Sequence, residues 1–241
     1  MSEDGGDPYM HHPGLRGRIA DPLASYFRTF RPADLDERLA ALGRADWRHS
    51  DQAVEAMRRS FLGGRLESDL WVFAYGSLMW DPGFRFAEVR RARIAGYARR
   101  FILYDTLARG SEEAPGVQAA LDVGGGCDGL AFRIAAAEVD AETGFIWRRE
   151  LFAPAYRPVF VGARTALGRV EALAMVADRD AHIIHPDLSR SDQVRFLATG
   201  EGILGSSLAY IETLAAQFDA LHIDDPEVTS LLAEARAYAA G

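Results

Sequence analysis

The fold is decided by the stretch Leu70-Trp71-Val72-Phe73-Ala74-Tyr75-Gly76-Ser77-Leu78-Met79-Trp80. Its first residues are bulky and apolar, which favours a buried strand, and a polar turn then interrupts the apolar run. Gly76 permits a close approach of the backbone, and Ser77 adds a hydroxyl beside the backbone amides. N–H groups in such a turn can form a concavity that binds a carboxylate or a phosphate. The stretch therefore predicts a core strand followed by an anion-binding loop, the plainer interpretation being an ordinary strand-to-loop turn.

A second informative stretch runs from Phe145 to Phe160. Apolar positions among helix formers predict a helix over Ala136–Arg149, and two later prolines prevent it from continuing. Glu150 therefore stands at the C-terminus of a helix, where the macrodipole and burial beside aromatic residues both raise the pKa of a carboxyl group. Such a carboxyl group suits general acid/base work. The alternative is a surface glutamate paired with Arg148 or Arg149.

Together the two stretches resemble the ChaC family of γ-glutamylcyclotransferases, which degrade glutathione to 5-oxoproline and cysteinylglycine. In that family a Tyr-Gly-Ser-Leu loop ends the first core strand, and a later aromatic-x-Arg-Glu segment followed by a tyrosine carries the catalytic glutamate. Tyr75–Leu78, Trp147–Glu150 and Tyr156 stand in this order here. The likeness extends from Leu70 to roughly Ala220 and includes Arg99-Arg100-Phe101, Arg109-Gly110, Pro115-Gly116, Gly129–Arg133 and Gly205–Tyr210.

The resemblance implies an α+β fold, with a mixed β-barrel or sheet core surrounded by helices. It implies an enzyme without cofactor or metal, in which Glu150 is the general base and acid and the substrate is glutathione. The glutamyl group would be bound by Tyr75, Gly76, Ser77 and Leu78. Tyr156 and Tyr210 either supply hydroxyl groups to the substrate or are core aromatics with satisfied hydroxyls. Two alternatives stay open: a cyclotransferase acting on other γ-glutamyl amines or amino acids, and a non-catalytic binding module for small acidic metabolites.

The chain departs from the family pattern in two places. Ala74 and Pro154-Ala155 replace glycines that family members have beside the loop and before the later tyrosine. The loop after Glu150 is therefore expected to have its own shape. Some members also have an acidic residue upstream of the catalytic glutamate, and the chain offers three, none an unambiguous equivalent: Glu138, Asp140 and Glu142.

Composition fits a globular enzyme. The 241 residues are 49% hydrophobic, which suffices for one sizeable core plus an extension, and the net charge of −8 argues against nucleic acid as a partner. All basic residues are Arg, which excludes a lysine nucleophile. A single cysteine, Cys127, forms no internal disulfide and indicates a reducing compartment. With no long apolar run and no signal-like N-terminus, the sequence predicts a cytoplasmic protein without a membrane partner.

Two regions are expected along the chain. Residues 1–69 form an N-terminal extension, whose start, Met1–Gly17, lacks apolar periodicity and is predicted to be mobile. Amphipathic helices follow near Asp34–Ala41 and Ser50–Leu62. Residues 70–241 form the catalytic domain, with strands predicted at Leu70–Tyr75, Val89–Leu103 with a break, Val117–Val123, Gly129–Ile134, Arg157–Val161 and Arg169–Val176, and helices near Ser191–Ala198, Leu204–Leu221 and Pro226–Ala239.

Three further motifs are discounted. Gly124–Gly129 has the spacing G-x-G-x-x-G, but a strand-like run follows it where a dinucleotide site needs a helix, so it is interpreted as a hairpin turn. His182 and His185 have nearby carboxylates only in a loop-like segment, and no metal site is expected. Cys127 has no neighbouring activator and is not expected to be a nucleophile.

Overall fold

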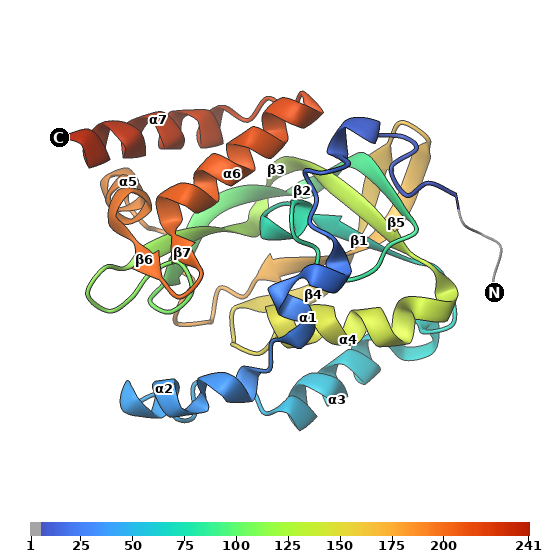
Figure 1. The fold of residues 1–241 in the computed structure, drawn as a ribbon, viewed down its shortest axis with the longest axis horizontal. Coiled ribbons are helices and arrows are strands. Elements are labelled where there is room, and N and C mark those ends of the chain that lie inside the picture. The colour runs from blue at the N-terminus through green and yellow to red at the C-terminus, as the bar shows by residue number, and fades with distance from the viewer. Residues whose placement is uncertain (1–5) are drawn as a thin grey trace. The chain divides into compact units, whose positions relative to one another are not determined.

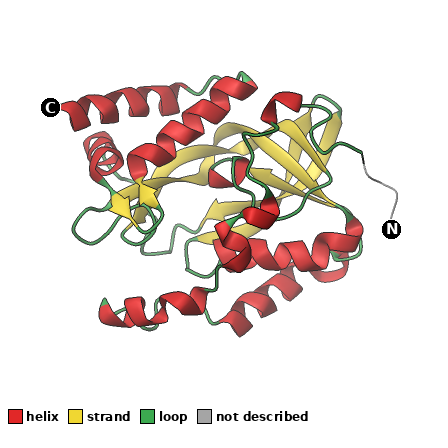
Figure 2. Cartoon of the chain, in the orientation of Figure 1, coloured by secondary structure: helices red, strands yellow, loops and turns green. Residues whose placement is uncertain are grey.

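The computed structural model describes residues 6–241, and its centre is a closed barrel of five strands (Figure 1). The barrel has the strand order β1-β3-β2-β4-β5, which confirms the α+β expectation. The strands are β1 (Leu70–Ala74), β2 (Glu88–Asp105), β3 (Gly116–Ile134), β4 (Tyr156–Thr165) and β5 (Gly168–Ala177). Figure 2 distinguishes these strands from the helices and the connecting loops.

The short strand β1 lies between β3 and β5. It pairs antiparallel with β3, from Leu70 opposite Ile134 to Ala74 opposite Leu130, and parallel with β5. Having neighbours on both sides suits its apolar sequence, because such a strand is buried on both faces. The loop that follows β1 is thereby held against the core.

The chain divides into two compact units. The first consists of Met1–Ala95, as far as it is described, and Cys127–Asp178; the second consists of Gly96–Gly126 and Arg179–Gly241. The first holds α1 (Tyr26–Thr29), α2 (Asp36–Ala41), α3 (Asp51–Leu62), α4 (Val139–Glu150), and short 3-10 turns at Pro13–Leu15, Pro22–Ala24, Pro32–Leu35, Gly63–Arg65, Ser77–Met79 and Ala136–Glu138. The second holds α5 (Arg190–Thr199), α6 (Ser207–Leu221), α7 (Pro226–Ala240) and a small hairpin of β6 (Glu201–Gly202) and β7 (Gly205–Ser206).

Each unit has its own apolar core. Phe73, Phe84, Phe132 and Trp147 are fully buried in the first unit. Phe101, Leu121, Leu197 and Leu231 are fully buried in the second. The helices α2 and α3 lie where the sequence places the two amphipathic helices of the extension, with Leu39 buried in α2 and Val54 and Leu62 buried in α3.

The expectation of a mobile start does not hold for residues 6–17; residues 1–5 lie outside the described part of the chain. Leu15 is 1% exposed, the Val89 amide donates to the carbonyl of Pro8, and the Arg91 amide donates to Nε2 of His12. The segment lacks periodicity because it packs against β2 through single side chains and backbone groups instead of a helix face.

The glycine-rich run Gly124–Gly129 is not the hairpin turn that its composition suggested. It lies inside the continuous strand β3, and no helix follows it. A Cβ at Gly124 would stand 2.5 Å from the Cβ of Ala98, so the two backbones approach too closely there for a side chain. Gly124 therefore marks a close approach of two strands and not a turn. The break expected in the preceding strand is likewise absent, because β2 is continuous.

The motif residues of the second unit stabilise a loop after β2. The Asp105 carboxylate accepts hydrogen bonds from the backbone amides of residues 107–109. The Ser207 hydroxyl accepts from the Val117 amide and donates to the Arg109 carbonyl. The pairs Arg109-Gly110 and Pro115-Gly116 therefore flank a tightly bonded turn.

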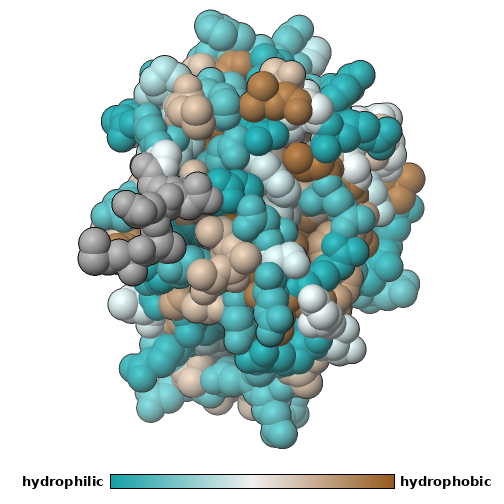
Figure 3. Space-filling model, turned by 90° about the vertical axis from the view of Figure 1, so that its right-hand side faces the viewer, coloured by the Kyte–Doolittle hydropathy of each residue, from teal (hydrophilic) through white to brown (hydrophobic). Residues whose placement is uncertain are grey.

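Hydrophobic residues on the face drawn in Figure 3 are scattered among hydrophilic ones. The exposed large hydrophobic residues, such as Leu23, Leu167 and Tyr238, belong to different elements. Within residues 6–241, none of the helices has the length and apolar character needed to cross a bilayer.

Candidate active site

The loop after β1 presents unpaired backbone amides. The turn at Ser77–Met79 is closed by a hydrogen bond from the Met79 amide to the Gly76 carbonyl, 2.9 Å long. The carbonyl of Ser77 accepts from the amide of Asp81 at 3.0 Å. Among the described residues, the amides of Gly76, Ser77 and Leu78 have no hydrogen-bond acceptor. N–H groups without an acceptor in a turn can bind an anion, and the anion-binding role of this loop stays a prediction.

Glu150 is the last residue of α4, as the two prolines after it predict. The helix packs through Val139, Ile146 and Trp147, all at most 1% exposed, and the Leu151 amide closes its end by donating to the Trp147 carbonyl. The Glu150 side chain is 14% exposed. A carboxyl group is thus held at the edge of the core by a rigid helix.

Arg149 connects Glu150 to the loop after β1. Its Nε atom lies 2.9 Å from Oε1 of Glu150, and its Nη2 donates to the Ser77 hydroxyl at 2.8 Å. Its Nη1 donates to the carbonyl of Asp81, and its guanidinium lies 3.7 Å from the ring centroid of Phe27. The sequence suggested Arg149 only as an ion-pair partner of Glu150, and nothing in it marks the contact with Ser77.

Burial raises the pKa of the Glu150 carboxyl, and the charge and hydrogen bond of Arg149 oppose part of that rise. The alternative of a surface glutamate paired with a neighbouring arginine is therefore only half right, since the pair exists but is buried. A carboxyl group with a raised pKa next to a cation can exchange a proton with a bound amine.

Asp81 is a polar residue of this site that the sequence analysis missed. Its Oδ1 atom is buried and has no hydrogen-bond donor among the described residues, although its carbonyl accepts from Arg149. A buried carboxylate oxygen without a donor is costly, and a bound ammonium group would satisfy it. Its position four residues after Ser77 in a polar turn was the available signal.

The two predicted tyrosines lie in different units. Tyr156 is half-buried and begins β4, opposite Ala177 of β5. Tyr210 lies in α6 and is 2% exposed. Their roles toward a substrate remain predictions.

The acidic residues upstream of Glu150 have structural partners. Glu142 is fully buried and pairs with Arg28 and Arg85. Glu138 also pairs with Arg85, and Asp140 pairs with the arginines of α3. Arg85 lies late in the loop after β1, and within the described structure none of the three acidic residues bonds to residues 75–81 at its start.

The other residues considered from sequence lie outside this cluster. His185 bonds the carbonyl of His182 through its ring, and Cys127, which forms no disulfide, is buried in β3. In the described part of the chain, no three His, Cys, Asp or Glu side chains are grouped so that they could hold a metal ion.

Comparison with known proteins identifies the family of this chain. The model of the ChaC-like protein family matches residues 70–238. The chain belongs to the ChaC-like family. Its relatives include the glutathione-specific γ-glutamylcyclotransferase of Escherichia coli K12, 30% identical over 69% of this chain and 72% of the relative. Glutathione-specific γ-glutamylcyclotransferase 1 of Danio rerio is 30% identical over 68% of this chain and 88% of its own.

The fold of this ChaC-like chain is also found in a solved structure. The crystal structure of a yeast γ-glutamyl cyclotransferase specific to glutathione matches with a TM-score of 0.66 at 19% identity, covering 71% of this chain and 97% of that one. The likeness supports the barrel with its surrounding helices.

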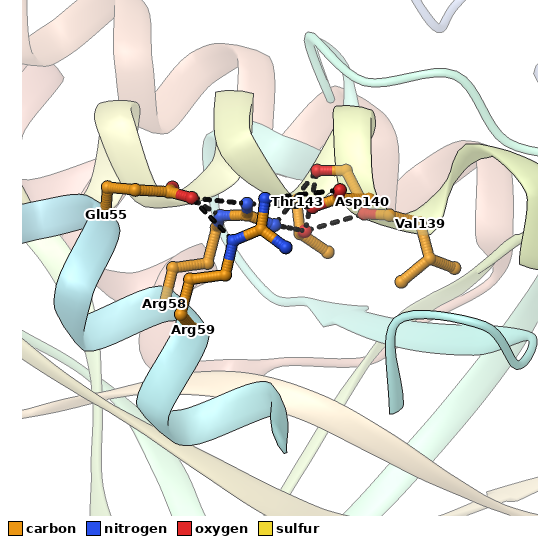
Figure 4. Close-up of polar contacts among 6 residues, drawn as sticks. All are labelled: Glu55, Arg58, Arg59, Val139, Asp140 and Thr143. Atoms are coloured by element: carbon orange, nitrogen blue, oxygen red, sulfur yellow. Dashed lines mark hydrogen bonds and ion pairs between the residues drawn. The ribbon is translucent and has the colours of Figure 1, made fainter. Parts of the chain in front are cut away.

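The extension that precedes the family match packs against the helix that carries Glu150. Arg58 of α3 is 3% exposed and donates to the Asp140 carbonyl at 2.9 Å and to the Thr143 hydroxyl at 2.8 Å. Figure 4 shows Arg58 and Arg59 between Glu55 of α3 and Asp140 of α4. The first turns of α4 are therefore fixed by residues from outside the matched region.

Proposed function

We propose that the protein degrades glutathione by intramolecular cyclisation, releasing 5-oxoproline and cysteinylglycine, with Glu150 as general base and then general acid. The observation that carries this proposal is the link from the buried Glu150 through Arg149 to Ser77, beside free loop amides. The glutathione-specific names of the relatives support the choice of substrate.

The reaction needs little from the protein besides positioning and proton transfer. The α-amine of the γ-glutamyl group attacks its own γ-carbonyl carbon, so the new C–N bond closes a five-membered lactam and the bond to the cysteine nitrogen breaks. Glu150 takes a proton from the α-ammonium and delivers it to the departing cysteine nitrogen, and the second proton that the attacking nitrogen loses on forming the lactam converts the released amine to an ammonium. No water is consumed, and no protein nucleophile is required.

The loop would hold the glutamyl group while this happens. The amides of Gly76, Ser77 and Leu78 are donors for its α-carboxylate or for the oxygen of the attacked carbonyl. Asp81 offers the free Oδ1 as an acceptor for the α-ammonium. Tyr75 is proposed to contact the glutamyl group together with the rest of the loop, and Tyr156, of the same unit, to contact the remainder of the substrate. Tyr210 belongs to the other unit, and its role stays a prediction from the sequence. The buried Cys127, which forms no disulfide, is consistent with the reducing cytoplasm, where glutathione keeps thiols reduced.

Turnover of glutathione, followed by 5-oxoproline formation, tests the proposal. We expect Glu150→Gln to fold like the wild type and to lose about 10²–10⁴-fold in turnover, because the amide keeps the shape without the proton transfer. Glu171→Gln, at an exposed glutamate of β5 that pairs with Arg65, is the control and should keep its activity. A Glu150→Gln protein with most of its activity would refute the assignment.

A substrate panel separates the alternatives. Glutathione, γ-glutamyl amino acids and γ-glutamyl amines are assayed side by side with the wild type. We expect the highest kcat/KM for glutathione. Preference for another γ-glutamyl compound would assign the broader cyclotransferase activity, and binding without turnover of any compound would assign the binding module.

A further inference from the structure

A pocket of about 280 Å³ lies beside α3 and α4, on residues that the proposed reaction does not use. Its lining includes Asp51 and Val54 of α3 and Gly144, Phe145, Trp147 and Arg148 of α4. Because α3 belongs to the extension, the pocket is partly built from residues outside the family match.

Two hydrogen-bond donors of the pocket lining have no acceptor. The indole Nε1 of Trp147 and the Nε of Arg148 are both buried without a partner in the described structure. Buried N–H groups are nearly always bonded, so two of them on adjacent residues of one pocket require an explanation. A ligand that accepts hydrogen bonds would supply it.

The charge of Arg148 is also unbalanced. Arg28 and Arg148 both lie against the ring of Phe145, with guanidinium carbons 3.8 and 4.6 Å from its centroid. Arg28 is neutralised by Glu142, whereas no carboxylate within the described residues forms an ion pair with Arg148. Burial and the nearby Arg28 lower the pKa of Arg148, and the charge of Asp51 opposes part of that shift without an ion-pair contact. The pocket therefore favours an anion.

Gly144 keeps this space open. It lies in the middle of α4, where glycine is less favourable than alanine, and its backbone does not require glycine because its φ is not positive. A Cβ built there would meet no atom within 4 Å. The glycine thus leaves unfilled volume on the part of α4 that also carries Trp147 and Arg148 in the pocket lining.

We propose that this pocket binds a small organic carboxylate with a flat apolar group. One carboxylate oxygen would accept from Arg148 and Trp147, and the apolar group would lie against Phe145 and Val54. The pocket lining also contains the carboxylates of Asp51 and Glu55. They pair with Arg48 and Arg58, but their negative charges still disfavour a multiply charged ligand such as phosphate. A monoanion matches the single unpaired guanidinium.

The test uses the full-length protein with its four tryptophans labelled with ¹⁵N, and phenylacetate as the probe. The indole signal of Trp147 is assigned as the one missing from Trp147→Phe. We expect this signal to shift saturably, with a dissociation constant on the order of 1 mM, the scale for a ligand of so few atoms. Phenylacetate should also raise the thermal unfolding midpoint of the wild type.

Two variants and one control decide the outcome. Gly144→Leu fills the pocket without a backbone clash and should abolish the shift, and Arg148→Gln should weaken binding at least about tenfold. Arg38→Gln, on the exposed face of α2 and outside the pocket lining, should bind like the wild type. A shift that persists in folded Gly144→Leu, an equal response to inorganic phosphate, or no response of the wild type would each overturn the proposal.

Discussion

At the scale of single residues, Arg149 determines how the candidate site is held together. One guanidinium contacts Glu150, Ser77 and the ring of Phe27, which come from α4, the loop after β1 and the extension. The sequence places Arg149 next to Glu150, but its contact with Ser77 spans 72 positions. Such a contact follows from the tertiary position of the end of α4 next to the loop after β1, which no local pattern encodes.

Replacing Arg149 should therefore change the pH profile of the reaction. Removing a cation beside Glu150 disfavours the carboxylate and raises its pKa further, so the acidic limb of kcat/KM should move to higher pH in Arg149→Gln. Arg149→Lys keeps the positive charge and should return the acidic limb most of the way to its wild-type pH, although it does not restore the bond to Ser77. A profile of Arg149→Gln that coincides with the wild type would exclude this positioning role.

The same shift has a consequence for stability. Because the pKa of Glu150 in the folded protein lies above its ordinary value of 4.5, the folded state binds this proton more tightly than the unfolded state. The stabilisation that protonated Glu150 contributes is complete below pH 4.5, and it is lost as the pH rises through the folded-state pKa. Relative to Glu150→Gln, the wild type should accordingly lose stability as the pH is raised toward neutrality, as measured by unfolding midpoints.

The loop residues differ in how much each contributes. Gly76→Val adds a side chain where the glutamyl group must approach, and it restricts the backbone dihedral angles of the turn. Turnover should nearly disappear, while circular dichroism should show an intact fold. Ser77→Ala removes one hydroxyl while the backbone donors remain, and it should stay within about a tenfold loss of kcat/KM, or ~1.4 kcal/mol. Normal kinetics of a folded Gly76→Val protein would show that the loop is not the substrate site.

At the scale of elements, α3 stabilises α4 through a pair of adjacent arginines that share their partners. Arg58 and Arg59 both bond Glu55 and Asp140, but Arg58 is buried and also reaches Thr143. Arg58→Ala should lower the free energy of unfolding by about 2 kcal/mol, because buried partners lose their donor. Arg59→Ala, at a half-exposed side chain, should cost less than about 1 kcal/mol. Equal costs in urea unfolding would contradict this account.

The elements themselves could be predicted from sequence wherever a local pattern fixed them. The end of α4 at Glu150 follows from the prolines after it. The start of α7 follows from Asp225, whose side chain caps the helix, and from Pro226, its first residue. The pattern failed in β3, where Gly124 marks a close contact with Ala98 of another strand. Glycine has the same signature in a turn and at such a contact, and only the partner strand distinguishes them.

At the scale of the whole molecule, the extension covers the outside of the candidate site. The Ala20 amide donates to the carbonyl of Trp80, and the His49 amide donates to that of Phe152, both at 2.7 Å. Phe30 and Trp47 contact the ring of Phe152. The two amphipathic helices were predicted from sequence, but their position could not be, since an apolar face indicates that a helix packs without indicating against what.

A chain of residues 70–241 tests what the extension contributes. It keeps every proposed site residue and the whole family match, so a purely modular extension would leave stability and turnover unchanged. We expect both to fall, since Arg149 loses Phe27, the buried Glu142 loses Arg28, and the face of α4 around Trp147 loses the cover of α3. The free energy of unfolding should drop by several kcal/mol, because removing a buried contact costs about 2–5 kcal/mol.

Glutathione turnover and thermal unfolding of the two chains are compared at equal concentration. Wild-type turnover by the shorter chain would show that the site is complete without the extension and that residues 1–69 serve another purpose.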